Sequence, residues 1–185
     1  MAQPTPSLVT ARLRLRPVRP TMAAELHTLL GHPEVQRHLL KGGELTREWV
    51  NQEIRESMAR FQARKPGIWV LEPLEGGAPI GLGGYRDFHD PPELQLVLAL
   101  APTFWHEGLA TEAGRALLTV GFGWGRLRRI VAEAHRPDLR AHRLLERLGM
   151  RRSRSRRKGG DPEVARFVLT RKEAKAAEGE QATRH

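Results

Sequence analysis

The segment from Leu98 to Ala113 combines residue types that could bind an anion. A strand-like stretch stops at Pro102, and a helix is expected to begin near Gly108. Gly108 and Ala110 carry minimal side chains in the first turn of that helix, where free backbone N–H groups and the positive end of the dipole can close on a phosphate. The same small residues would also suit a tight connection that only permits packing. The spacing alone leaves both interpretations open.

Positive charge is concentrated in one part of the chain. The protein has 185 residues and a formal net charge of +10. Residues 126–158 hold 13 basic and three acidic side chains, so this stretch accounts for the whole net charge. A neutral body with one basic stretch favours a local site for an anion over a general nucleic-acid coat.

Composition excludes several classes of protein. Because 39% of the residues are hydrophobic and 28% charged, one folded domain is expected rather than a disordered chain. Cys is absent, which excludes disulfides, thiolate metal sites and a cysteine nucleophile. No signal pattern and no apolar run of about 20 residues is present, so we expect a cytoplasmic protein with no membrane contact. The His residues show no metal-ligand spacing, and no metal is predicted.

Hydrophobic periodicity predicts the elements that position these residues. Alternation predicts strands at 12–16, 68–71, 79–85, 94–101, 129–135, 150–157 and 163–170. Helical spacing predicts helices within 21–40 and at 46–64, 108–124 and 138–148. We expect a flexible N-terminus at 1–9, one domain at 10–172 and a polar tail at 173–185, with the chain loose from Arg171 onward. The order predicts an α/β (α+β) fold with one mixed central sheet of about six to seven strands, flanked by about four helices.

Two motifs resemble the GNAT superfamily of N-acetyltransferases, and most of all its branch of ribosomal-protein N-terminal (serine/alanine) acetyltransferases. The acetyl-coenzyme A loop of that branch is roughly Pro-x-x-Trp-Gly-x-Gly-Tyr-Ala-Thr-Glu-Ala. This chain matches it at Pro102, Trp105, Gly108, Ala110, Thr111, Glu112 and Ala113. Leu144–Met150 is similar to the helix end Val-Leu-Glu-Lys-Leu-Gly-Phe, and Thr10–Pro17 is similar to the first strand.

The resemblance covers about residues 10–172 and implies a single GNAT-like domain. It also implies transfer of an acetyl group from acetyl-CoA to a primary amine by direct attack. The residues that it places against acetyl-CoA are Leu98, Ala99, Leu100, His106, Glu107, Gly108, Leu109, Ala110, Thr111, Asp138 and Arg143.

Asp138 and Arg143 belong to the later helix. Asp138 stands where the family usually has an Asn beside the pantetheine arm, and it is also a good N-cap. Arg143 lies in a stripe with Arg136, Arg140 and Arg147, and it is the candidate for a phosphate contact. A solvated surface face is the alternative for each of these arginines.

The chain departs from the family pattern at several site positions. His106 replaces the first loop glycine, and Leu109 replaces the Tyr. Ala141 stands where this branch has a Ser, and Leu145 stands where many relatives have a Tyr that acts as general acid. Because Leu cannot transfer a proton, the resemblance supports cofactor binding better than it supports a particular catalytic acid.

Acetylation of an amine needs a base that accepts a proton, directly or through water. Glu133 lies on the strand expected to border the cleft, five residues before Asp138, and some N-terminal acetyltransferases place a base there. His135 shares the face of Glu133 and would titrate near neutrality. Glu133 and His135 are therefore the catalytic candidates, and a structural ion pair with neighbouring arginines is the alternative for Glu133.

The acceptor amine is left open. The branch implies a protein N-terminus, and a small amine is the alternative. Trp49, Trp69, Tyr85 and Phe88 could wall an acceptor pocket or lie in the core. The run Arg151–Lys158 could contact RNA or the ribosome, or serve as a charged edge strand.

A second hypothesis is a catalytically weak CoA-binding or RNA- or ribosome-associated protein of the same fold. It rests on the missing Ser and Tyr together with the basic strand. Either a monomer or a homodimer is expected.

Overall fold

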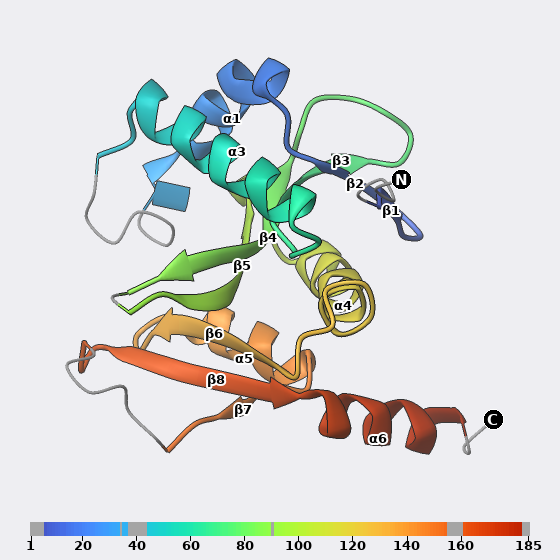
Figure 1. Ribbon diagram of the computed structural model, residues 1–185. Helices are drawn as coiled ribbons and strands as arrows, with labels where there is room; N and C mark the ends of the chain where they lie inside the picture. The colour runs from blue at the N-terminus through green and yellow to red at the C-terminus, as the bar shows by residue number, and fades with distance from the viewer. Residues whose placement is uncertain (1–5, 34, 37–43, 90, 155–160, 183–185) are drawn as a thin grey trace.

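The computed structural model describes residues 6–33, 35–36, 44–89, 91–154 and 161–182. Two β-sheets lie one above the other in Figure 1. The five-stranded sheet has the order β1 (Leu8–Val9), β2 (Leu13–Pro17), β3 (Ile68–Pro73), β4 (Gly81–Phe88) and β5 (Glu93–Leu100). The three-stranded sheet has the order β6 (Arg129–His135), β8 (Val164–Thr170) and β7 (Arg151–Arg152).

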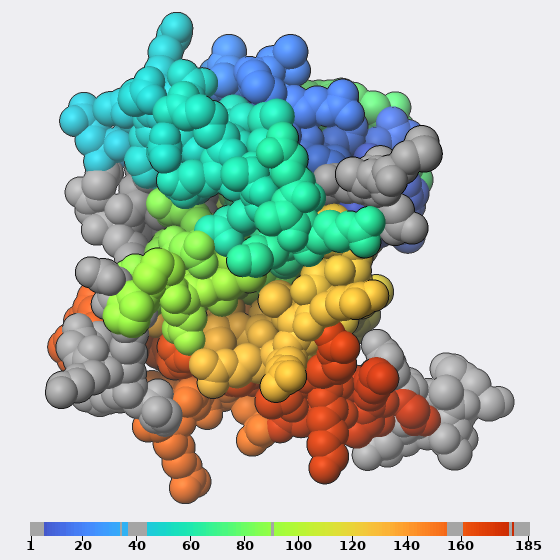
Figure 2. Space-filling view, in the orientation of Figure 1, coloured from blue at the N-terminus to red at the C-terminus, as the bar shows by residue number. Residues whose placement is uncertain are grey.

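The helices pack around these sheets. They are α1 (Ala23–Leu30), α3 (Arg47–Gln62), α4 (Leu109–Phe122), α5 (Leu139–Arg147) and α6 (Arg171–Ala182), with 3-10 turns at Pro20–Met22 and Pro102–Phe104. Helices α1 and α3 contact each other on one side of the larger sheet, and the atoms of α3 (teal) cover that side in Figure 2. No described helix is long and apolar enough to cross a membrane.

The predicted α/β class is confirmed, but the single mixed sheet is wrong. Every strand pair is antiparallel, and β5 and β6 contact each other while belonging to different sheets. The chain therefore divides its strands into two sheets that part between β5 and β6.

The alternation that predicted the first strand is confirmed. Leu13 and Leu15 are buried, while the arginines between and beside them are exposed. Leu15 pairs with Leu71 of β3 in the core. Tyr85, also fully buried, donates a hydrogen bond from its hydroxyl to the carbonyl of Leu117 at 2.8 Å, which fixes α4 against β4.

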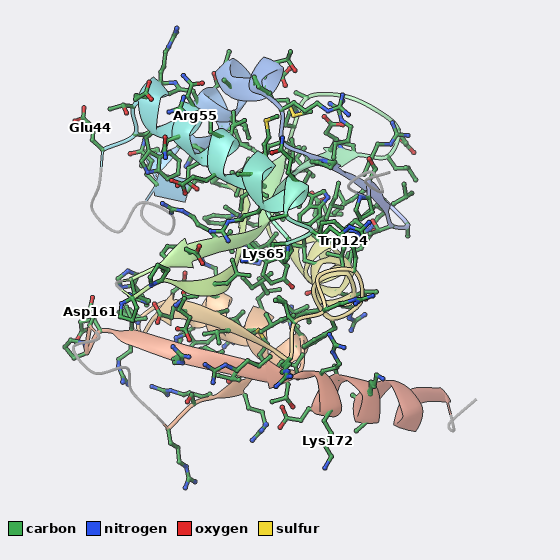
Figure 3. All side chains as sticks on the ribbon, viewed as in Figure 1. Glu44, Arg55, Lys65, Trp124, Asp161 and Lys172 are labelled. Atoms are coloured by element: carbon green, nitrogen blue, oxygen red, sulfur yellow. The ribbon has the colours of Figure 1, made fainter. Side chains whose placement is uncertain are left out.

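Two segments near the chain ends, Leu8–Val9 and Arg171–Ala182, form regular structure that was not expected. Leu8 and Val9, predicted to be flexible, pair with β2. The residues from Arg171 onward, predicted to be loose, form α6. A capping box explains this helix, because Glu173 accepts hydrogen bonds from the N–H and Oγ1 of Thr170, and its own N–H donates to that Oγ1 at 3.3 Å. In Figure 3, Asp161 lies shortly before β8 and Lys172 lies in α6, which follows it.

The predicted strand at 150–157 is only partly present. Arg151 and Arg152 form β7, and residues 155–160 lie outside the described part of the chain. Arg151 is paired with Glu173 of α6, while Arg154 is exposed.

Candidate active site

A cavity of about 320 Å³ lies where β5 parts from β6. Its wall is built by β5, by the loop and first turn of α4, by β6 and by α5. All but two of the predicted site residues line it. Glu107 is exposed and uses its carbonyl to accept a hydrogen bond from Arg12 at 3.0 Å, while Leu109 is buried in the core. Neither of these two residues lines the cavity.

The loop before α4 is held between β5 and α5. Trp105 Nε1 donates to the carbonyl of Leu100 at 2.9 Å. The guanidinium of Arg140 lies 4.1 Å from the centre of the Trp105 ring, a cation–π contact. His106 and Gly108 both adopt left-handed backbone conformations, with φ of 68° and 79°. This loop therefore turns sharply into the helix.

The N-terminus of α4 lies at the cavity wall. Gly108 provides no side-chain cap, and Gly108, Ala110 and Thr111 line the cavity. An uncapped helix start with small side chains favours an anion.

Glu112, which matches the acetyl-CoA motif, has a structural role. Its carboxylate accepts hydrogen bonds from Thr10 Oγ1 at 2.6 Å and from the backbone N–H and Nε of Arg12, each at 2.8 Å. Burial alone would raise the pKa of Glu112, but these hydrogen bonds outweigh it and lower the pKa. Glu112 thus ties the start of the domain to α4 and does not line the cavity.

Helix α5 supplies the cationic wall. Arg140, Arg143 and Arg147 all line the cavity. Arg136 does not, and its Nε donates to the carbonyl of Pro162 at 2.6 Å. The stripe predicted from the sequence is therefore divided, with three members turned to the cavity and one to a neighbouring loop.

Asp138 lies on the same wall and caps α5. Its carboxylate accepts from the N–H groups of Arg140 and Ala141 at 3.2 and 3.1 Å. The predicted N-cap is confirmed. The same carboxylate lies 3.9 Å from Nε of Arg140, so it also contacts one of the cationic side chains of this wall.

Glu133 supplies a carboxylate to the part of the cavity wall that β6 forms. Its side chain is only 10% exposed, and both its oxygens lie 3.1 Å from Nε2 of His89. His89 follows β4 in a left-handed conformation with φ of 74°. In the β6–β8 ladder, Glu133 stands opposite Arg166. The contact of Glu133 with His89 was not predicted from the sequence, because 44 residues separate the two.

His135 also lines the cavity, two residues beyond Glu133. Its carbonyl accepts from His142 Nε2 and from the N–H of Asp138, both at 3.0 Å. These contacts fix the end of β6 against the start of α5.

The four aromatic candidates for an acceptor pocket do not lie together in the structure. Phe88 lines the cavity, whereas Trp69 and Tyr85 lie in the core. Trp49 lines a separate, smaller cavity together with Glu53 and Arg86, which are paired at 2.8 Å. Burial raises the pKa of Glu53, although Arg86 opposes the effect.

Metal ligands are not gathered anywhere in the described ranges. No three His, Asp or Glu side chains among those residues are grouped so as to hold a metal ion.

The comparisons with known proteins agree with this geometry. The sequence model described as an acetyltransferase (GNAT) domain matches residues 12–151. The uncharacterized protein YkkB of Bacillus subtilis (strain 168) is 29% identical over 163 residues, which make up 84% of this chain and 91% of that protein.

Two solved structures share the fold. An acetyltransferase from Agrobacterium tumefaciens str. C58 superimposes with a TM-score of 0.78 at 21% identity, covering 92% of this chain and 98% of the other. RimL, described as a ribosomal L7/L12 alpha-N-protein acetyltransferase in complex with coenzyme A, gives 0.70 at 14% identity, covering 88% and 96%.

Proposed function

The chain belongs to the GNAT acetyltransferase family, and on this premise we propose that it transfers an acetyl group from acetyl-CoA to a primary amine. One observation carries the proposal. A single cavity has a cationic end, made by Arg143 and its neighbours beside the start of α4, and a carboxylate, Glu133, on its β6 wall. A polyanionic acetyl donor and a cationic acceptor need these two features in one space.

The cationic end fits the phosphates of coenzyme A. Uncapped N–H groups of α4 and the guanidinium groups of α5 are the donors that phosphate oxygens prefer. RimL, which shares the fold, is described as binding coenzyme A. Arg143 and Arg147 would hold phosphate charge, while Ala110 would present a backbone donor in the first turn of α4.

The end of β5 suits the pantetheine arm. Leu98, Ala99 and Leu100 pair with β4 along one edge of the strand, and they line the cavity. Backbone groups on an unpaired strand edge can hydrogen-bond an extended amide chain. Asp138 lies beside this path, with its carboxylate engaged in the cap of α5.

Acetyl-CoA, when bound, supplies an acetyl thioester. Glu133 takes the proton of the acceptor ammonium, directly or through a water, and so leaves a neutral amine for direct attack on the thioester carbonyl. As the N–C bond forms, the C–S bond breaks, and coenzyme A leaves as the thiol with the proton that the attacking nitrogen releases. His89 holds the Glu133 carboxylate in place through both oxygens. His135 is the alternative base on the same wall.

The acceptor is a protein N-terminus or a small amine. The first is supported by RimL, whose description names the L7/L12 protein. A cavity wall that holds Phe88 and Glu133 suits a cationic amine with an apolar neighbour.

Thiol release from acetyl-CoA tests this proposal. We would measure it with a panel of amines and peptides for the wild type, Glu133→Gln and the control Glu146→Gln, which is exposed on α5 and outside the cavity. Loss of a general base predicts a kcat lower by about 10²–10⁴-fold for Glu133→Gln with little change in the KM for acetyl-CoA. Glu146→Gln should match the wild type.

Two outcomes would contradict the proposal. Full activity of Glu133→Gln across pH would exclude Glu133 as the base. Binding of acetyl-CoA without transfer to any acceptor, together with tight RNA binding that weakens steeply with salt, would favour a CoA-binding or RNA-associated protein instead. This second function is tested because Leu145, which lines the cavity, cannot donate a proton to the leaving thiolate.

A further inference from the structure

Gln95 is a buried amide in the cavity wall that the proposed chemistry does not use. It lies on β5 opposite Arg86, is only 2% exposed and lines the cavity. Its Nε2 has no hydrogen-bond partner among the described residues. The pKa of Glu93 is lowered mainly by a hydrogen bond from Arg166 and to a smaller extent by the nearby Gln95 amide. The contact between Gln95 Nε2 and Glu93 nevertheless lacks the geometry of a hydrogen bond.

The unpartnered amide is unusual within this protein. Ser57, also 2% exposed, accepts a hydrogen bond from the N–H of Ile68 at 2.7 Å, and the buried Glu72 binds Arg16. Within the described part of the chain, the other buried side-chain nitrogen without a partner belongs to Arg171, which does not line the cavity. Because an unpaired buried N–H costs free energy, a donor kept at this place indicates a ligand that accepts from it.

The strand faces place Gln95 on the same side as Glu133. Gln95 shares its face of β5 with Glu93, since the two are separated by one residue. Glu93 binds Arg166, and Arg166 stands opposite Glu133 in the β6–β8 ladder. Gln95 and Glu133, the carboxylate that would receive the acceptor's proton, therefore lie at the same part of the cavity wall.

Resting on the function proposed above, we propose that Gln95 Nε2 donates a hydrogen bond to a carbonyl oxygen next to the reacting amine of the acceptor. An α-aminoacyl group presents this combination, because its amine and its carbonyl are attached to one carbon atom. The ammonium of such an acceptor gives its proton to Glu133, and Gln95 moves no proton. An alkylamine leaves Nε2 unpaired, so Gln95 selects aminoacyl acceptors over alkylamines.

Two small acceptors of similar size test the selection. Alaninamide carries the carbonyl group, and isopropylamine lacks it. Gln95→Met keeps about the same volume and removes the donor. We expect kcat/KM for alaninamide to fall tenfold or more in Gln95→Met, while kcat/KM for isopropylamine changes less than twofold. Comparing each amine between the two proteins cancels the difference in amine basicity.

Thermal unfolding separates this role from a structural one. Gln95→Met removes a donor without a partner but also the favourable effect of that amide on the Glu93 carboxylate, so the variant should unfold close to the temperature of the wild type. The matched control is Ser57→Ala, which removes a buried polar group that has a partner and lies outside the cavity. It should lower the unfolding temperature and leave the ratio of the two kcat/KM values unchanged.

The other outcomes overturn the inference. If Gln95→Met leaves the ratio of the two kcat/KM values unchanged, acceptor recognition by Gln95 is excluded. If that unchanged ratio comes with earlier unfolding, Gln95 has a structural role. These results leave the acetyl-transfer proposal intact. If the wild type acetylates neither amine, calorimetric binding in the presence of coenzyme A decides, and wild-type protein that binds alaninamide no better than isopropylamine overturns the inference.

Discussion

Glu93 and Arg166 join the two sheets beside the cavity. Arg166 on β8 binds both oxygens of Glu93 on β5, at 2.5 and 2.6 Å, and the two side chains are only 21% and 16% exposed. Arg129 of β6 lies 3.6 Å from the same carboxylate. One carboxylate thus contacts two strands of the opposite sheet, and it limits how far β5 can stand from β6.

Removal of this carboxylate should destabilise the fold in a pH-dependent way. At pH 7, Glu93→Gln is expected to lower the free energy of unfolding by about 2 kcal/mol, since Arg166 loses its charged partner in a partly buried place. The pKa of Glu93 is lowered, chiefly by the hydrogen bond from Arg166. Its contribution is therefore complete above the unfolded-state pKa of about 4.3 and is lost as the pH falls through the lowered pKa.

Urea unfolding of both proteins between pH 7 and pH 3 measures this difference. Glu48→Gln is the control, because its ion pair with Arg55 is exposed on α3 and should contribute less than about 0.5 kcal/mol. A difference between wild type and Glu93→Gln that stays constant down to pH 3 would show that the ion pair is not its source.

His89 should affect turnover rather than cofactor binding. Its Nε2 contacts both oxygens of Glu133, so His89→Ala frees the carboxylate to rotate away from the acceptor. We expect kcat to fall by about tenfold, as is typical when a supporting contact of a reactive group is lost, with the KM for acetyl-CoA unchanged. Steady-state thiol release measures both constants. His89→Gln, which keeps a donor, should recover part of the loss, and a change confined to KM would contradict this role.

Arg143 should contribute to binding of acetyl-CoA. Loss of one charge-assisted contact to phosphate in Arg143→Gln predicts a Kd higher by about tenfold, a change of about 1.4 kcal/mol. Calorimetric titration measures it, and the difference should shrink at high salt. Arg136→Gln is the matched control because Arg136 binds the Pro162 carbonyl outside the cavity. Equal effects of the two substitutions would assign the change to overall charge.

Local features of the site were predictable from sequence. The positions of Gly108 before α4 and of Asp138 at the start of α5 are determined by residues close to them in the sequence. The structure places both as expected. The capping box of Thr170 and Glu173 was equally local, but the apolar pattern of α6 is weak and the signal was missed.

Features that depend on distant pairs were not predictable. The contact between the two sheets relies on Glu93 and Arg166, which are 73 residues apart, and the contact of His89 with Glu133 spans 44. The unpartnered Nε2 of Gln95 is visible only once its surroundings are known, because an isolated Gln in an alternating strand has no distinguishing pattern.

Asp138 allows stability and cofactor binding to be separated. Asp138→Ala removes the acceptor for two N–H groups of α5 and should lower the free energy of unfolding by about 1 kcal/mol. Asp138→Asn keeps an oxygen acceptor, so it should unfold within about 0.5 kcal/mol of the wild type. Because α5 carries Arg140 and Arg143 on the cavity wall, fraying in Asp138→Ala should also raise the KM for acetyl-CoA, while Asp138→Asn should leave it unchanged. Chemical unfolding and steady-state kinetics on the three proteins measure both effects. An Asp138→Ala protein that keeps the wild-type stability would show that this cap does not hold the helix that carries the cationic wall.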